Sequence, residues 1–371
     1  LIEVRASDAG RVPADWVRIN STKRAVRFHT PAIVELQRQR DRHREMLTAV
    51  ANEAFRDFVR HVAQVYMPLR RAVHALATID VLTSLARVAS RPGYVRPHVH
   101  DQGNSIQLRQ CRHPVTEART NGYIPNDIAL GSLKQTEAPR GMLLTGSNMG
   151  GKSSMMRAIA LTVIMAQIGS FVPCQSAEIT CRDAIASRMG ARDDILRGES
   201  TFLVEARETA FILRTSTPRT LVLLDEFGRG TSTFDGMALA YAVLRSFLER
   251  GPAMPTLLFI THYAPLTRLA HLFPQQLMNV HMQVQIMRHQ GKEDEVVFLH
   301  RVLPGAASRS FGIHAAALSG IPTTIIERAK IKALELEEAE RLVHYAHVVK
   351  LLGQGDAEAA LESIQSITLE A

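Results

Sequence analysis

The sequence predicts an α/β domain with helical segments on both sides of it. Short apolar runs with the length and aliphatic content of buried strands alternate with amphipathic segments. These runs are residues 142–145, 221–224 and 256–261. Residues 32–67 contain neither Gly nor Pro, which predicts a long helix before the α/β domain. Helical patterns return after that domain, at residues 310–318 and 323–346.

The composition is that of a globular protein with a basic net charge. The 371 residues are 46% hydrophobic and 22% charged, which excludes an intrinsically disordered chain. Lys and Arg outnumber Asp and Glu by 44 to 36. The net charge of +8 favours a polyanionic partner such as nucleic acid, although such a charge spread over a large surface can also serve solubility alone.

The cysteines indicate the redox state of the compartment, and the apolar runs indicate whether the chain spans a membrane. Cys111, Cys174 and Cys181 are an odd number without the spacing of paired ligands, which argues against a disulfide framework and a zinc site and predicts a reducing compartment. The longest apolar stretch, 158–172, is interrupted by polar residues, so we expect no membrane span, and no secretory signal precedes it. Because the chain starts at Leu1 rather than Met, we expect it to be the C-terminal piece of a longer protein.

The long helix has clear start and stop signals. Thr30 is suited to cap it and Pro31 to its first position, and Pro68 is expected to end it. At 1.5 Å per residue it would span roughly 55 Å, which suits a lever or spacer. A coiled-coil arm is the alternative, but the apolar stripe is not a sustained heptad. A second helical pattern, 69–89, leads into a linker at 90–93.

The strongest chemical signal is a glycine-rich turn between a predicted strand and a predicted helix. Residues 146–153 fit the phosphate-binding pattern G-x-x-x-x-G-K-[ST]. The residues are Gly146, Ser147, Asn148, Met149, Gly150, Gly151, Lys152 and Ser153. Backbone amides there can surround a β-phosphate, Lys152 can reach the β and γ oxygens, and Ser153 can ligate Mg²⁺. A chance Gly-rich turn is the alternative.

Two further signals follow at strand ends. Asp225 and Glu226 end an apolar run, where open α/β sheets bind ligands. Asp225 would hold the Mg²⁺ shell and Glu226 would deprotonate the attacking water, although apolar runs that end in acids are common. His262 follows the next strand and could sense the γ-phosphate or donate to it, whereas a lone His there is often structural.

These motifs resemble the ATPase domain of the MutS mismatch-repair family. The resemblance rests on the runs 145–153, 198–202 and 225–233 and on Asp235 and Gly236. It implies a P-loop (ABC-type) ATPase fold preceded by a lever helix and followed by a helical dimerisation end. The implied domains are the end of a DNA clamp at 1–30, the lever helix and junction at 31–95, the ATPase domain at 96–303 and a helix-turn-helix dimerisation region at 304–371.

The resemblance also implies individual roles. Tyr123 would stack on adenine, Asn148 would hold the γ-phosphate or its water, and Ser154 would join the nucleotide-binding set. Ser200 would belong to a signature loop that reaches the partner's nucleotide, so the working unit would contain two ATPase domains. An ordinary half-buried tyrosine and a helix cap are the alternatives for Tyr123 and Ser200. The family usually has proline in place of Ser147 and a smaller aliphatic residue in place of Phe227.

The function implied is ATP-dependent DNA mismatch repair. Binding and hydrolysis of ATP with Mg²⁺ would be coupled to clamping on DNA with mismatches or insertion/deletion loops, in a nuclear heterodimer with a second MutS homologue. Residues 21–23, 27–29 and 74–80 most resemble the branch of third eukaryotic homologues, which prefers such loops. A meiotic clamp on branched DNA is the alternative. An SMC-like or transporter ATPase is disfavoured, because only 225 − 152 = 73 positions separate Lys152 from Asp225.

Overall fold

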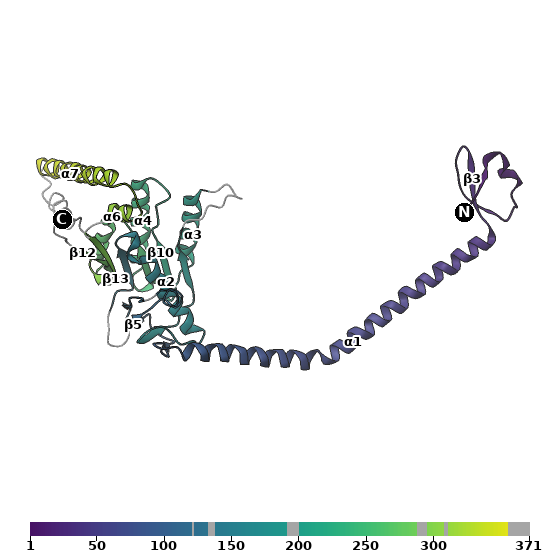
Figure 1. The fold of residues 1–371 in the computed structure, drawn as a ribbon, viewed down its shortest axis with the longest axis horizontal. Coiled ribbons are helices and arrows are strands. Elements are labelled where there is room, and N and C mark those ends of the chain that lie inside the picture. The colour runs from purple at the N-terminus through teal and green to yellow at the C-terminus, as the bar shows by residue number, and fades with distance from the viewer. Residues whose placement is uncertain (121, 133–137, 191–199, 288–294, 308–310, 355–371) are drawn as a thin grey trace. The chain divides into compact units, whose positions relative to one another are not determined.

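The computed structural model describes the chain except for residues 121, 133–137, 191–199, 288–294, 308–310 and 355–371 (Figure 1). The chain divides into two compact units, Leu1–Thr83 and Ser84–Ala371, and one helix runs from the first into the second.

The first unit begins with a small antiparallel sheet. Its strands are β1 (Ile2–Arg5), β2 (Val17–Ser21) and β3 (Ala25–His29), in the order β1-β3-β2, with the 3-10 helix η1 (Ala6–Arg11) after β1. Val26 and Phe28 of the central strand are buried, and Trp16 packs edge-on against the Phe28 ring.

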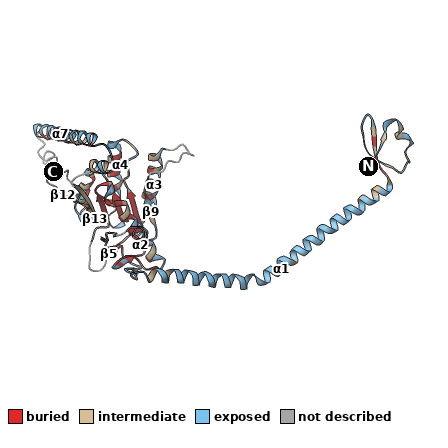
Figure 2. Cartoon of the chain, in the orientation of Figure 1, coloured by how far each residue is buried: buried red, intermediate tan, exposed pale blue. Residues whose placement is uncertain are grey.

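Helix α1 (Pro31–Ala89) is longer than the sequence predicts. Thr30 caps it as expected, since its Oγ1 accepts from the Ile33 N–H at 3.3 Å. The prediction that Pro68 ends the helix is wrong, because Pro68 lies inside it. A proline removes one N–H and crowds the carbonyl four residues earlier, at a cost of about 3 kcal/mol. Because α1 has no buried residue, water can satisfy the freed carbonyl, and the remaining hydrogen bonds carry the helix past the proline (Figure 2).

Helix α1 is long and apolar enough to cross a membrane by length and composition alone, although the interrupted apolar runs of the sequence predict no span. None of its residues is buried. A single helix of this kind is weak evidence for a membrane span.

The second unit is the expected α/β domain, built on two sheets. In the described residues the larger sheet has the order β13-β12-β7-β11-β10-β9, and β13 alone runs antiparallel to its neighbour. Its strands are β7 (Gly141–Thr145), β9 (Ile185–Arg188), β10 (Leu221–Asp225), β11 (Thr256–Ile260), β12 (Leu277–Met287) and β13 (Glu295–Pro304). The smaller sheet has the order β4-β8-β5-β6. Its strands are β4 (His98–His100), β5 (Ile106–Cys111), β6 (Asn126–Leu130) and β8 (Ser176–Thr180).

Helices pack on both faces of the larger sheet, α2 (Lys152–Gln167) on one and α3 (Thr201–Thr215) and α4 (Thr233–Leu248) on the other. The remaining helices are α5 (Leu269–Leu272), α6 (Gly312–Leu318) and α7 (Thr323–Gly353), with the short 3-10 helices η2 (Asn148–Gly150), η4 (Gly251–Ala253) and η5 (Ala264–Arg268). Because side chains alternate along a strand, β10 sends Leu221 and Leu223 to the core under α2, and Val222 and Leu224 to the core under α3 and α4. The three central predicted strands are confirmed, and α7 extends seven residues beyond its predicted end at 346.

The core under α4 is expected to dominate the stability of the domain. Phe247 is fully buried there, so Phe247→Ala should lower the free energy of unfolding by about 3–5 kcal/mol. Denaturant unfolding of the purified protein measures this. Phe211→Ala on α3, where the ring is 59% exposed, is the matched control and should change stability by less than about 0.5 kcal/mol. Equal losses in the two variants would contradict this assignment of the core.

Candidate active site

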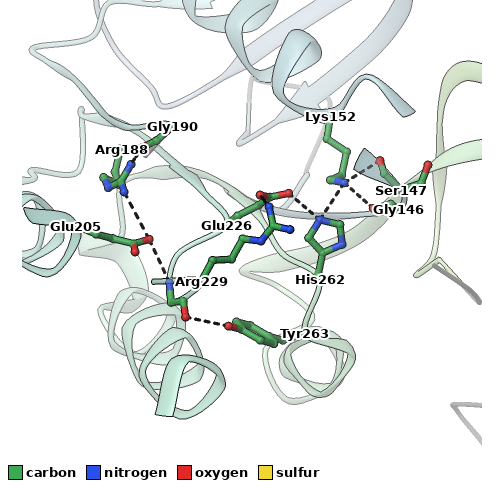
Figure 3. A network of polar contacts seen from close by, with 11 residues as sticks. Gly146, Ser147, Lys152, Arg188, Gly190, Glu205, Glu226, Arg229, His262 and Tyr263 are labelled. Atoms are coloured by element: carbon green, nitrogen blue, oxygen red, sulfur yellow. Dashed lines mark hydrogen bonds and ion pairs between the residues drawn. The ribbon is translucent and has the colours of Figure 1, made fainter. Parts of the chain in front are cut away.

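The predicted site residues gather at the carboxyl ends of three adjacent parallel strands. The glycine-rich turn follows β7, the acid pair ends β10, and His262 follows β11, which lies between those two strands. Residues from three separate sequence motifs therefore meet at one edge of the sheet (Figure 3).

The glycine-rich turn needs its glycines for both conformation and space. Gly146 and Gly151 have φ values of +123° and +93°, which L side chains rarely adopt. A Cβ at Gly150 would lie 3.0 Å from Met282 Cβ. Ser147 has φ −67°, the value that a proline ring imposes, so serine here keeps the backbone that the family's usual proline would have. Its hydroxyl is buried, and no hydrogen bond satisfies it in the described part of the chain.

Lys152 occupies the centre of the turn. Its side chain is 2% exposed, and Nζ donates to the carbonyl oxygens of Gly146 at 2.5 Å and Ser147 at 2.8 Å. His262 Nε2 lies 3.5 Å from the same nitrogen. Burial lowers the pKa of Lys152 to about 8, against the opposing effects of Glu226 and Asp225. Because burial disfavours the charged form of Lys152, an anionic ligand beside it would stabilise that form.

Asp225 and Ser153 form the candidate metal position. Burial raises the pKa of Asp225, and the neighbouring Ser153 hydroxyl opposes that shift. Asp225 Oδ1 is buried without a hydrogen-bond partner among the described residues. Those residues include no group of three or more His, Cys, Asp or Glu arranged to hold a metal ion. The pair suits Mg²⁺, which takes one or two protein oxygens and fills its shell with water and substrate phosphate.

Glu226 is held in an unusual conformation between the side chains of His262 and Arg229. Its φ of +55° is rare for a non-glycine residue and costs about 1–3 kcal/mol. Its Oε1 lies 2.6 Å from His262 Nε2, and Arg229 donates to its Oε2. The hydrogen bond with His262 lowers the pKa of Glu226, although burial opposes it. The carboxylate is thus kept ionised, as a proton acceptor requires.

A cavity of about 230 Å³ lies beside this carboxylate. Glu226, Arg229 and His262 line it together with Thr231 and Thr261. A larger cavity of about 570 Å³ borders Arg140 and Met254, near the opposite ends of β7 and β11. The smaller one has the chemistry that the motifs predict.

The remaining predicted residues fall into three groups. Tyr123 is half-buried, and burial raises the pKa of its phenol while the neighbouring Ser154 hydroxyl opposes that shift, so these two residues lie together. Ser200 caps α3, since its Oγ accepts from the Leu203 N–H at 3.2 Å, which is the alternative that the sequence left open. Met149 is 52% exposed, and the Asn148 side chain lies outside the described part of the chain.

Three residues that contact Glu226 or the turn after it were not among the predicted site residues. Arg229 lies within the motif 225–233, but that motif predicts no role for it. Glu205 and Tyr263 both hydrogen-bond to the backbone of Gly228. A glutamate one turn into an amphipathic helix carries no signal of such a contact in a single sequence.

Comparison with known proteins identifies the class to which this fold and site belong. MutS domain V matches residues 142–337, more than half of the chain. The chain belongs to the MutS family.

Its relatives within that family are Msh3 proteins, in agreement with the predicted branch. It is 48% identical over 358 residues to DNA mismatch repair protein msh3 of Aspergillus niger, covering 95% of this chain and 31% of that protein. It is 45% identical over 370 residues to DNA mismatch repair protein MSH3 of Phaeosphaeria nodorum, covering 98% and 32% respectively. The chain thus spans about a third of the length of these relatives.

Proposed function

We propose that this chain is the ATP-hydrolysing part of a DNA mismatch-repair protein that couples ATP binding and turnover to clamping on DNA. The observation that carries the proposal is the meeting of Lys152, the Ser153–Asp225 pair and Glu226 at one sheet edge in a MutS domain V. A buried lysine, a metal-type oxygen pair and an ionised base are the parts that phosphoryl transfer to water needs.

The residues divide the work as follows. Amides of the glycine turn and Lys152 bind the phosphates, for which Lys152 exchanges its carbonyl partners for phosphate oxygens. Ser153 and Asp225 would hold Mg²⁺, which when bound neutralises charge on the β- and γ-phosphates. Glu226 accepts the proton of the water that attacks the γ-phosphorus, and His262 can donate to the γ-phosphate oxygens. Tyr123 offers a ring beside Ser154 for stacking on adenine.

The proposed working unit is a nuclear heterodimer with a second MutS homologue. Ser200, at the start of α3, would approach the partner's nucleotide, and the dimerisation region 304–371 contains α6 and α7. Mismatch repair in a eukaryote acts on nuclear DNA, and the relatives are fungal mismatch-repair proteins. Helix α1 is the candidate lever between DNA and ATPase.

Nucleotide affinity is expected to fall above pH 8. Free Lys152 has a pKa of about 8, and bound phosphates raise it, so binding above that pH requires proton uptake. Affinity should decrease only slightly up to pH 8, where half of Lys152 is still charged, and then by up to about ten-fold per pH unit. Titration with a fluorescent ATP analogue and Mg²⁺ measures this, and Lys152→Arg, which does not titrate in that range, is the control. A level wild-type profile, or the same slope in the control, would contradict the assignment.

DNA binding tests the function itself. The full-length protein, purified with its partner subunit, should bind duplexes with extrahelical loops at least about ten-fold more tightly than homoduplex, and ATP should change the lifetime of that complex. Affinities for loop, homoduplex and Holliday-junction DNA are measured side by side at one salt concentration. A strong junction preference would instead support the meiotic clamp, which the names of the relatives disfavour.

A further inference from the structure

A buried carboxylate that the proposed reaction does not use lies behind the acid pair. Glu205, on α3, is 4% exposed. Its Oε1 accepts from the Gly228 N–H at 3.1 Å. Burial raises the pKa of this carboxyl, and the Gly228 and Gly230 amides oppose that shift. Arg188, at the end of β9 and equally buried, approaches it to 3.8 Å (Figure 3). A buried charge persists only where such partners satisfy it, so its position is closely defined.

The amide that Glu205 holds belongs to a turn with little freedom of its own. Gly228 has φ +97°, and a Cβ there would lie 2.5 Å from the carbonyl oxygen of Gly236. The Gly228 carbonyl accepts from the Tyr263 hydroxyl at 3.0 Å. Side chains therefore hold this peptide unit from two sides, Glu205 at the N–H and Tyr263 at the carbonyl.

This turn fixes the direction of Glu226. The Glu226 N–H is bonded to the Ile260 carbonyl at 3.0 Å, which anchors the turn on its upstream side. Two residues later Gly228 provides the downstream anchor. Because Glu226 has an unfavourable positive φ, it keeps that conformation only while both anchors hold.

Helix α3 also lies directly against the turn. A Cβ at Gly230 would meet Phe202 Cβ at 3.0 Å and the Phe202 backbone nitrogen at 3.2 Å. The first turn of α3 thus contacts the same segment, residues 228–230, as Glu205, which lies about one turn further along the helix. A displacement of this end of α3 would therefore move the downstream anchor of Glu226.

We propose that Glu205, supported by Arg188, is a positioning residue that holds Glu226 in its water-activating orientation through the amides of Gly228 and Gly230. This rests on the proposed function, and it assigns to α3 control over the same active site. Glu205 touches neither nucleotide nor water in this account and acts only through the turn.

The test compares turnover with nucleotide affinity in the full-length protein, purified with a partner whose own nucleotide site is inactivated. Glu205→Ala should lower kcat on the order of ten- to a hundred-fold, because misplaced catalytic groups cost that much. The Kd of a fluorescent ATP analogue with Mg²⁺ should stay within about three-fold, since Lys152 and the glycine turn are untouched. Glu205→Gln keeps an acceptor oxygen for the amides and should recover most of kcat.

The matched control is Glu208→Ala. Glu208 lies on the same helix and pairs with the same Arg188 at 3.1 Å, but its side chain is 52% exposed and no contact with the turn is seen among the described residues. It should keep wild-type kcat. If Glu205→Ala does not fold, Tyr263→Phe decides, because it removes only the hydroxyl at the other side of Gly228 and should also lower kcat with little effect on Kd.

Two results would overturn the proposal: wild-type kcat in folded Glu205→Ala or in Tyr263→Phe, or parallel loss of kcat and affinity that Glu205→Gln does not relieve. Inactive Glu226→Gln together with fully active Glu205→Ala would reject this inference and leave the proposed function standing. Full activity in Glu226→Gln would remove Glu226 from the role of base, whereas absence of ATP turnover in the wild type would reject the proposed function itself.

Discussion

Glu226→Gln is expected to abolish ATP turnover and to leave ATP binding in place. The carboxylate is the only proton acceptor that we assign to the attacking water, and an amide cannot take that role. We expect kcat to fall by about 10²–10⁴-fold. The nucleotide Kd should change by less than about three-fold, because Lys152 and the glycine turn provide the phosphate contacts. Steady-state hydrolysis and equilibrium titration of the partnered full-length protein measure the two quantities.

The control for this substitution is Glu249→Gln. Glu249 follows α4 and pairs with Arg245 at 2.7 Å on the exposed surface. It undergoes the same chemical change away from the site and should keep wild-type turnover. Undiminished hydrolysis in Glu226→Gln would remove Glu226 from the role of base.

Lys152→Ala is expected to have the largest effect on binding. Loss of a charge-assisted contact to phosphate of about 2–3 kcal/mol corresponds to a roughly thirty- to hundred-fold weaker Kd. The free protein should not lose stability in proportion, because burial already disfavours the charged form of this lysine.

Thermal unfolding separates these two effects. A ligand at 100 times its Kd stabilises a folded protein by about 2.7 kcal/mol, so the wild type should gain stability with a non-hydrolysable ATP analogue and Mg²⁺. Lys152→Ala should gain much less at the same concentration, while its unfolding temperature without nucleotide stays close to that of the wild type. An equal gain in the two proteins would show that Lys152 does not contact the nucleotide.

Local sequence was sufficient to predict the parts of the site that follow strands directly. The order of residues 146–153 alone predicts the glycine turn. The apolar runs that precede the acid pair and His262 are sufficient to predict their positions at strand ends. Strand order then brings them together, since β11 lies between β7 and β10. Phe227 stands where the family usually has a smaller aliphatic residue, and it fits its surroundings, because the ring is 4% exposed in the core under α4.

Features that depend on tertiary surroundings could not be predicted in this way. The break at Pro68 was expected from propensity alone, which does not count the hydrogen bonds on either side that keep α1 continuous. Ile164 has the spacing of an apolar face of α2, but it is 43% exposed. Glu205 reads as an ordinary polar residue of an amphipathic helix, and only the packing of α3 against the 225–230 turn reveals its contact.

One equilibrium titration tests the central claim, that a single triphosphate binds between the glycine turn and the acid pair. A fluorescent ATP analogue is added to the folded, partnered full-length protein with Mg²⁺ and then with EDTA, the partner's own site being inactivated. We predict saturable binding with one nucleotide per chain, weakened when the metal is removed. Absence of saturable binding with Mg²⁺ present would contradict the account.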